Sequence, residues 1–238
     1  MEQNIVETPH LLNAWAWAEK NRKQILIGAG VAAVVGLALG YAAWARGVKE
    51  EAAGQALSTA LYNASGQRTE AGEAGAALLK VAADNRGTQA GTQALFLAGG
   101  ALFNAGKYSE AQATFERFAR EQASHPLVAT ALYGAGTALA AQEGKLPEAA
   151  QAYKSVVDRF PKSPIAPQAR YSLAGIWAAQ NNLEPAVALY EEVARGAAGN
   201  SLGNEAALRA DELRAKLPPP PAVATPAPTS TNAPAAQP

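Results

Sequence analysis

Residues able to do acid–base or metal chemistry are few and scattered in this chain. Its 238 residues contain two histidines, His10 and His125, and no cysteine. Neither histidine has a companion at metal-ligand spacing, and without cysteine there is no thiol nucleophile, disulfide or iron–sulfur ligand. After residue 45 the only aspartates are Asp84, Asp158 and Asp211, which lie far apart in the sequence. We therefore expect no metal, no cofactor and no catalytic centre.

Two patterns that could suggest chemistry have simpler explanations. Gly28-Ala29-Gly30 lies inside an apolar run, and it lacks the lysine and hydroxyl of a phosphate-binding loop. The pairs Glu50-Glu51 and Glu191-Glu192 are adjacent, so on a helix they point to different faces and should be solvated. The sequence predicts a protein that is not an enzyme and has no small-molecule substrate.

Charge excludes a further class of partner. After residue 45 the chain carries seventeen Lys and Arg against seventeen Asp and Glu. A neutral domain has no electrostatic attraction for the phosphate backbone of DNA or RNA. We expect no nucleic-acid binding.

The longest uncharged stretch runs for twenty residues, from Ile25 to Trp44. As a helix it would be about 30 Å long, the thickness of the bilayer hydrocarbon core. Tryptophans precede it at positions 15 and 17, as is typical of a headgroup layer. We predict a single transmembrane helix over 25–44, following a tail with an aromatic and basic juxtamembrane segment over 1–24. A signal peptide cleaved after Ala45 is the alternative, although the run is long and follows a polar segment of 24 residues.

The flanking charges bear on orientation. Lys20, Arg22 and Lys23 precede the run, whereas Arg46 and Lys49 follow it. The positive-inside rule then favours a cytoplasmic N-terminus and a C-terminal domain outside the cytoplasmic membrane.

Small residues recur every fourth position in the apolar run, at Gly28, Ala32, Gly36 and Gly40. Such a stripe lets two helix backbones approach closely in lipid, so it predicts association of the anchor with itself or with another membrane helix. A chance arrangement in an Ala- and Gly-rich helix is the alternative.

The remaining chain repeats itself. Ala-Gly pairs recur after 37 and then 39 residues, at Ala98-Gly99, Ala135-Gly136 and Ala174-Gly175. Each is followed by a turn and then by an alanine, an aromatic four residues later and an apolar residue three further on. The aromatic positions are Phe115, Tyr153 and Tyr190, and the apolar positions are Phe118, Val156 and Val193. Small residues facing each other let two helices pack closely, and the aromatic shares the face of the alanine.

This spacing predicts an all-α fold in which helical hairpins stack into a solenoid over 49–217. The clear repeats span 93–195, a degenerate unit spans 50–90 with helices over 51–64 and 70–84, and a cap helix spans 204–217. Pro147 and Pro185 should lie in the first turn of a helix, and Ser163 should cap another. From 218 to 238 the chain has eight prolines and no charge, which predicts a disordered tail.

The repeats resemble the tetratricopeptide repeat (TPR). A large residue opens each first helix, at Leu95, Leu132 and Tyr171, and Pro161 falls at the closing proline of that family. The repeats here are longer than the 34 residues of the family, and Phe118 stands where the family has alanine.

The layout of a short basic tail, one anchor and degenerate repeats also resembles two related bacterial groups. These are the ancillary subunits of the Sec translocon and the repeat domain of a cell-division coordinator. The resemblance implies repeats displayed in the periplasm and protein partners among translocon, chaperone or envelope proteins.

Family geometry implies a partner-binding groove along the inner side of the first helices. Its positions would be Gln93, Phe96, Gly100, Phe103, Asn104, Thr130, Tyr133, Thr137, Ser172, Ile176 and Gln180. This wall has no basic residue, so it does not suit acidic peptide ends and instead suits an apolar or helical peptide. For Phe96 and Tyr133 a place in the core is the alternative.

These observations favour a non-enzymatic, membrane-anchored adaptor that binds protein partners of translocation or envelope assembly. The alternatives are a structural scaffold whose anchor forms homo-oligomers, and a periplasmic cell-division coordinator.

Overall fold

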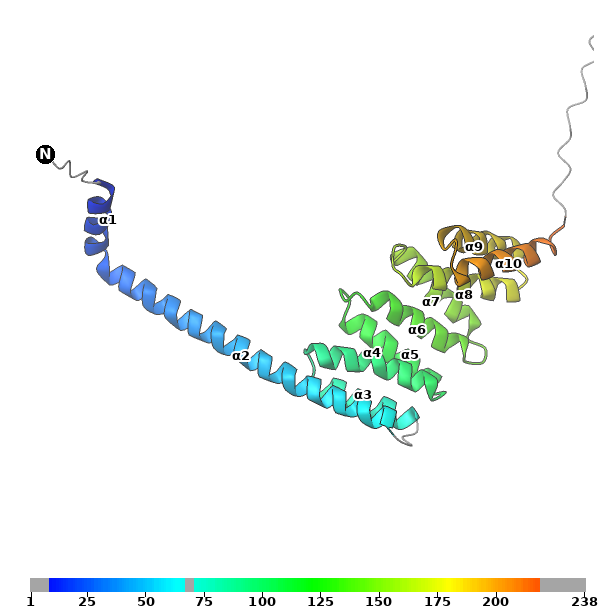
Figure 1. Cartoon of the computed structure of the whole chain (residues 1–238), viewed down its shortest axis with the longest axis horizontal. Helices are drawn as coiled ribbons and strands as arrows, with labels where there is room; N and C mark the ends of the chain where they lie inside the picture. The colour runs from blue at the N-terminus through cyan, green and yellow to red at the C-terminus, as the bar shows by residue number, and fades with distance from the viewer. Residues whose placement is uncertain (1–8, 67–70, 219–238) are drawn as a thin grey trace, which may run out of the picture. The chain divides into compact units, whose positions relative to one another are not determined.

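The computed structural model describes residues 9–66 and 71–218, and every regular element in these ranges is a helix. The predicted all-α fold is therefore confirmed. The proposed disordered tail falls, apart from Pro218, outside the described residues. In chain order the helices are α1 Pro9–Lys20, α2 Arg22–Gly66, α3 Ala71–Asp84, α4 Gln89–Asn104, α5 Tyr108–Glu121, α6 Val128–Ala140, α7 Leu146–Arg159, α8 Ala166–Ala179, α9 Leu183–Gly196 and α10 Ser201–Arg214 (Figure 1).

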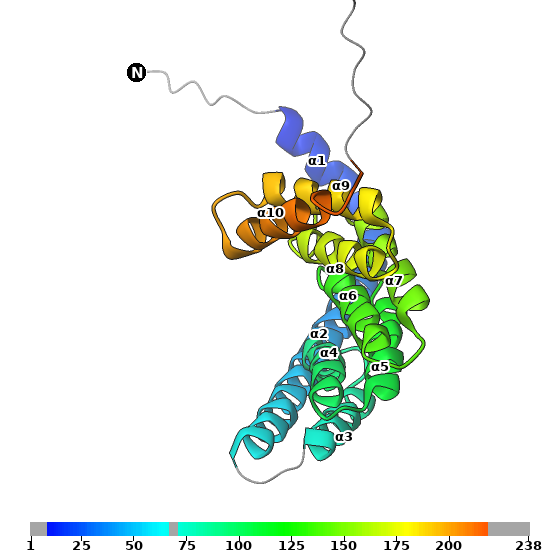
Figure 2. The same cartoon turned by 90° about the vertical axis from the view of Figure 1, so that its right-hand side faces the viewer.

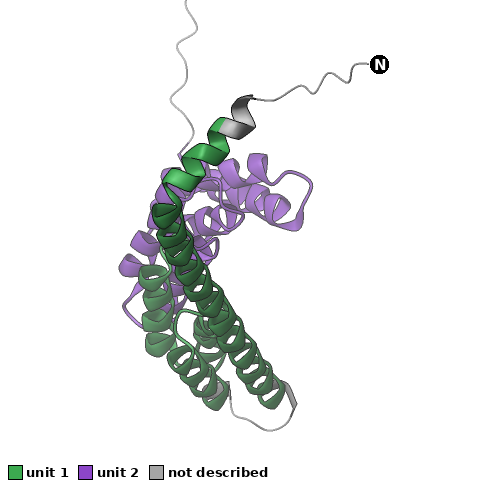
Figure 3. Cartoon of the chain, turned by 90° about the vertical axis from the view of Figure 1, so that its left-hand side faces the viewer, with its two compact units in different colours: residues 1–124 green, residues 125–238 purple. Residues whose placement is uncertain are grey.

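The chain divides into two compact units, residues 1–124 and 125–238 (Figure 3). The first contains α1 to α5, and the second contains α6 to α10. In each unit, helices that follow one another in sequence pack side by side, which is the arrangement expected of stacked helical hairpins.

The apolar run does not end in a separate anchor helix. Instead α2 runs without a break for 45 residues, about 67 Å at the usual rise, from Arg22 to Gly66 (Figure 1). We expected an independent helix over residues 51–64, and the structure corrects this. Hydropathy falls between Trp44 and Glu50, but the helix continues because this segment has no proline.

The first half of α2 is exposed along its length. Its most apolar stretch is not buried against any other part of the described chain. Leu26, Leu37 and Leu39 are each about two-thirds or more exposed, at 70%, 75% and 66%. Within the described residues this is the one helix long and apolar enough to cross a membrane, and a signal sequence near the N-terminus would have the same character.

The second half of α2 belongs to the core of the first unit. Ala53, Leu57 and Ala60 recur at helical spacing and are buried. This half of the helix packs against α3 and α4. The same helix that carries the apolar run therefore supplies the first element of the repeat array.

The predicted pairing of small and aromatic residues is present in both units. A methyl group placed on Gly99 would lie 2.7 Å from the ring of Phe115, and one on Gly136 would lie 2.9 Å from the ring of Tyr153. Both aromatic side chains are buried. Each glycine thus provides the room that the aromatic of the following helix occupies.

Helix α10 closes the second unit by packing on α9 (Figure 2). Its Glu205 accepts a hydrogen bond of 2.6 Å from the hydroxyl of Tyr171 in α8. Its Arg214 forms an ion pair with Glu191 in α9. Ala206, Ala210 and Leu213 bury the inner face of α10. These contacts cover the apolar face that the last repeat would otherwise leave open.

Candidate functional site

The positions predicted to form a groove fall on α4 in the first unit, and on α6 and the α8 region in the second. We call the first set the α4 face (Gln93, Phe96, Gly100, Phe103 and Asn104) and the second the α6–α8 face (Thr130, Tyr133, Thr137, Ser172 and Gln180). Because the two faces belong to different units, each is described by itself.

The α4 face combines half-buried aromatics with an open position between them. Phe96 packs edge-on against Phe115 and Phe118, with ring centroids 5.9 and 5.4 Å apart. Phe103 contacts the ring of Tyr108 at 5.2 Å. Between them, a methyl group on Gly100 would have no atom within 4 Å. Spacings of four and three residues place these positions on one side of α4, so Gly100 is an open position between two aromatic residues, which we call the notch.

The remaining α4 positions are exposed and polar. Gln93 and Asn104 both lie at the solvent-exposed surface. An amide can donate and accept hydrogen bonds, so the pair could engage the backbone of a segment laid across the notch. The α4 face therefore presents apolar contact in the middle and hydrogen-bonding groups at its ends.

On the α6–α8 face, hydroxyl groups connect three helices. The hydroxyl of Tyr133 in α6 lies 3.4 Å from that of Ser172 in α8. Tyr153 in α7 donates to the Thr137 hydroxyl at 3.2 Å, and Thr137 in turn donates to the carbonyl of Tyr133 at 3.0 Å. The rings of Tyr133 and Tyr153 are 5.4 Å apart. Thr130 is half-buried, and Gln180 is exposed just after α8.

One predicted groove residue belongs to the core. Ile176 is 7% exposed and packs in a cluster with Leu139, Ala149, Tyr153 and Leu173. Its side chain cannot meet a ligand, and it is removed from the groove. Phe96 and Tyr133, for which the core was the alternative, are half-buried and so contribute to both the core and the surface.

Burial sets the protonation state of the hydroxyl network. It raises the pKa of the Tyr153 phenol above its usual value, because a buried phenolate would lose its hydration. Tyr153 therefore stays protonated at neutral pH and acts as the donor to Thr137. The network positions side chains and has no group poised to transfer a proton near pH 7.

The positions predicted for membrane-helix association lie in the exposed half of α2. A methyl group on Gly28, Gly36 or Gly40 would meet no atom within 4 Å, and Ala32 is exposed on the same helix. These positions form one side of the helix by their spacing. Their use in association stays a prediction.

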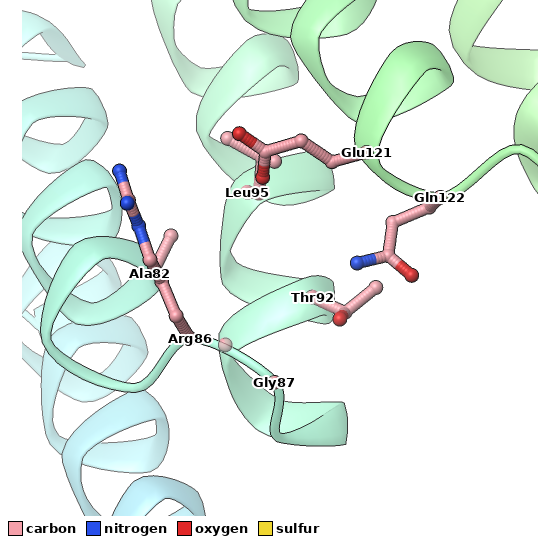
Figure 4. Close-up of a pocket in the computed structure, with 8 residues that line it drawn as sticks. Ala82, Arg86, Gly87, Thr92, Leu95, Glu121 and Gln122 are labelled. Carbon is pink, nitrogen blue, oxygen red and sulfur yellow. The ribbon is translucent and has the colours of Figure 1, made fainter.

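A pocket of about 230 Å³ lies between α3, α4 and α5 (Figure 4). Arg86 comes from the α3–α4 loop, Thr92 and Leu95 from α4, and Glu121 and Gln122 from the end of α5 and the residue after it. Sequence reasoning assigned none of these residues to a site. They come from three separate segments and have no common spacing, so no sequence signal could have found them.

A second feature missed from the sequence joins α2 to α4. Glu50, which we expected to be solvated, accepts hydrogen bonds from the backbone amides of Gln89 at 3.0 Å and Ala90 at 2.9 Å. The Thr88 hydroxyl accepts from Gly91 at 2.9 Å. Three otherwise unpaired amides at the start of α4 are satisfied in this way, and the Glu50 carboxylate lies at the positive end of the helix dipole.

Across residues 9–66 and 71–218 there is no group of three or more His, Asp or Glu side chains that could hold a metal ion. The α4 face and the α6–α8 face offer apolar contact and hydrogen bonding.

Comparison with known proteins identifies the repeats. Residues 96–164 and 142–201 match the tetratricopeptide repeat family model. Residues 96–201 therefore contain tetratricopeptide repeats, as the resemblance of the repeats implied. No curated protein sequence matches it.

Among solved structures, PcrH from Pseudomonas aeruginosa is 18% identical, with 53% of this chain and 94% of that chain covered and a TM-score of 0.47. MamA from Desulfovibrio magneticus RS-1, from residue 41 to its end, is also 18% identical. There 70% of this chain and 94% of that chain are covered, with a TM-score of 0.45.

Proposed function

We propose that this chain is a non-enzymatic adaptor, anchored in the cytoplasmic membrane by α2, whose repeats bind protein partners outside that membrane. The observation that carries the proposal is the construction of α2, in which one helix contains both an exposed apolar run of membrane-spanning length and a buried element of the repeat domain. An exposed apolar surface of this extent needs cover from lipid or from another apolar partner. Tetratricopeptide repeats are protein-binding modules in general, and the surfaces described above suit that role.

The partner that fits the α4 face is a peptide segment with one apolar side chain at its centre. The notch at Gly100, between the rings of Phe96 and Phe103, accepts such a side chain, while Gln93 and Asn104 meet the flanking backbone. Proteins of export or envelope assembly are the class that we propose, following the likeness of layout to translocon-associated proteins.

Photo-crosslinking in intact cells tests this proposal. A photo-reactive residue at Phe103 should capture a membrane or exported protein, whereas the same residue at Ala113, exposed on the neighbouring helix α5, should not. Gly100→Leu fills the notch, faces open space and keeps good helix propensity, so it should abolish the Phe103 adduct without loss of helicity. Capture of only cytosolic proteins would contradict the orientation, and an adduct that survives Gly100→Leu would contradict the site.

Orientation has its own test because the natural chain has no cysteine. Single cysteines at Asn13 and at Lys107 report on opposite sides of α2. A membrane-impermeant maleimide should label the second and not the first in intact cells. The reverse pattern would place the repeats in the cytoplasm.

A scaffold whose anchor dimerises is the second candidate, favoured by the open small-residue stripe at Gly28, Ala32, Gly36 and Gly40. The double variant Gly36→Leu and Gly40→Leu separates the two functions. In an adaptor the Phe103 adduct survives this change, whereas in a scaffold self-association and function are lost together.

A further inference from the structure

The start of α4 lies close to the end of the apolar run. Glu50 follows Trp44 by six residues, which is about 9 Å along the helix axis. Its carboxylate binds the amides of Gln89 and Ala90 directly, at 3.0 and 2.9 Å. If α2 crosses a bilayer with Trp44 at the hydrocarbon boundary, the start of α4 lies at the outer edge of the headgroup layer, which adds about 5–7 Å on each side.

Three exposed cationic residues flank the α2–α4 junction in the sequence. Arg46 and Lys49 are exposed on α2, between the apolar run and the Glu50 contact. Arg86 is exposed in the α3–α4 loop, three residues before Gln89 (Figure 4). We call Arg46, Lys49 and Arg86 the basic edge of the first unit. Their side chains are long, so each charge can reach several ångströms from the backbone.

Among residues 9–66 and 71–218 the basic edge has no ion pair, which it shares with Arg159 and Lys162 but which sets it apart from most cations of the repeat region. Within the described residues, no salt bridge involves any of its three members. Elsewhere in the repeats, by contrast, Lys80 pairs with Asp84 at 2.7 Å and Lys154 with Asp158 at 2.6 Å.

The carboxylates near the basic edge are mostly engaged. Glu50 is bound to the start of α4, Asp84 to Lys80, and Glu121 to Arg117 at 2.7 Å. Glu51 alone is exposed without a described partner. Glu50 keeps its charge while it binds backbone amides, so three cations against Glu50 and Glu51 leave a net charge of +1 where the headgroup phosphates would be.

We propose that the basic edge binds the phosphate groups of phospholipids in the leaflet that Trp44 reaches, so that the first unit rests on the bilayer surface. This rests on the proposed membrane anchoring. Arginine matches a phosphate with two hydrogen bonds, and lysine with a point charge. Attraction is strongest for anionic lipid and weakens as salt screens it.

Fluorescence quenching on the full chain in lipid nanodiscs tests the contact. Single cysteines carry a fluorophore at Gln89, beside the basic edge, at Lys107, at the far end of α4, or at Val35, in the middle of the apolar run. The nanodiscs contain phosphatidylcholine and phosphatidylglycerol with a headgroup-nitroxide lipid as the quencher. We expect stronger quenching at Gln89 than at Lys107.

The triple variant Arg46→Gln, Lys49→Gln and Arg86→Gln should lose most of the Gln89 quenching, and high salt should have the same effect on the wild-type chain. A control variant removes the same charge from paired residues, through Arg120→Gln, Lys154→Gln and Lys216→Gln, and should leave the quenching unchanged. Circular dichroism verifies that both variants are folded.

Two failures are distinguishable. If the Val35 fluorophore is shielded from water, the anchor is in place. The lipid contact is then overturned if quenching is equal at Gln89 and Lys107, or if the triple variant leaves the Gln89 quenching unaltered. A Val35 fluorophore in water overturns the anchor itself.

Discussion

Adjacent glycines in α4 have opposite environments. Gly99 faces the ring of Phe115, whereas Gly100 faces open space. The sequence alone predicted the first, because the Ala-Gly pair recurs with its aromatic partner in three repeats. The open environment of Gly100 was predicted only through family geometry, since nothing in the local sequence distinguishes an open glycine from a packed one.

Gly99→Ala should lower the stability of the first unit by about 1–2 kcal/mol, because the methyl group overlaps a buried ring and helix propensity recovers only part of the cost. Gly100→Ala should instead stabilise by up to about 1 kcal/mol, because alanine restricts the unfolded chain and meets no obstacle. Thermal unfolding followed by circular dichroism measures both. Equal midpoints would contradict the packing described for α4 and α5.

Tyr153 gives a dependence on alkaline pH. Its pKa is raised by burial, so above about pH 10 the unfolded chain loses this proton before the folded chain does. The unfolded state then binds fewer protons, and the contribution of Tyr153 to stability is present below pH 10 and is lost as pH rises through the folded-state pKa.

Tyr153→Phe should cost about 1 kcal/mol at pH 8, through the hydrogen bond lost to Thr137, and the difference from wild type should shrink as pH rises above 10. Denaturant unfolding across this pH range provides the measurement. Tyr62→Phe, at a side chain that is 74% exposed, should keep the slope of the wild-type chain. A stability difference between wild type and Tyr153→Phe that grows with pH would contradict the raised pKa of Tyr153.

At the scale of elements, the repeat helices follow from the sequence because each carries its own local signals. Pro147 lies in the first turn of α7 as predicted. The predicted cap at Ser163 is wrong, since α8 begins at Ala166 after Ile165 with no side-chain cap. The α2–α4 junction could not be predicted, because Glu50 meets amides 39 and 40 residues away through tertiary packing.

Glu50→Gln should destabilise the first unit by about 1–2 kcal/mol, because the start of α4 loses its negative charge and one strong acceptor. Glu51→Gln is the matched control, one residue along and exposed, and should change stability by less than about 0.5 kcal/mol. The midpoint of thermal unfolding compares them. An equal loss in both variants would assign the effect to net charge and not to the α4 contact.

At the scale of the whole molecule, α2 is unbroken, so in the proposed anchoring it fixes which side of the first unit faces a neighbour in the membrane. Inserting two alanines after Gly47 would turn the repeats by about 200° about the helix axis, whereas seven alanines would return them to within about 20°. For a partner held in the membrane, the Phe103 adduct should disappear with two added residues and return with seven.

The seven-residue insertion also raises Lys49 and Arg86 by about 10 Å and leaves Arg46 in place, so most of the Gln89 quenching should be lost although the facing side is kept. An adduct that is insensitive to both insertions would mean that the repeats swivel freely on the anchor.

In the proposed anchoring, a continuous α2 changes how a partner is found. A domain on a flexible linker samples many heights and directions, and most encounters with a membrane-bound target then fail in orientation. A domain fixed to its own spanning helix meets such a target by lateral diffusion in two dimensions, at one height and within a narrow range of tilts. The entropic cost of aligning the domain is then incurred when α2 inserts into the membrane and not when the partner binds. This raises the effective concentration for partners whose binding segment lies at the same distance from the membrane. The same geometry discriminates against otherwise suitable partners whose binding segment lies at another distance from the membrane.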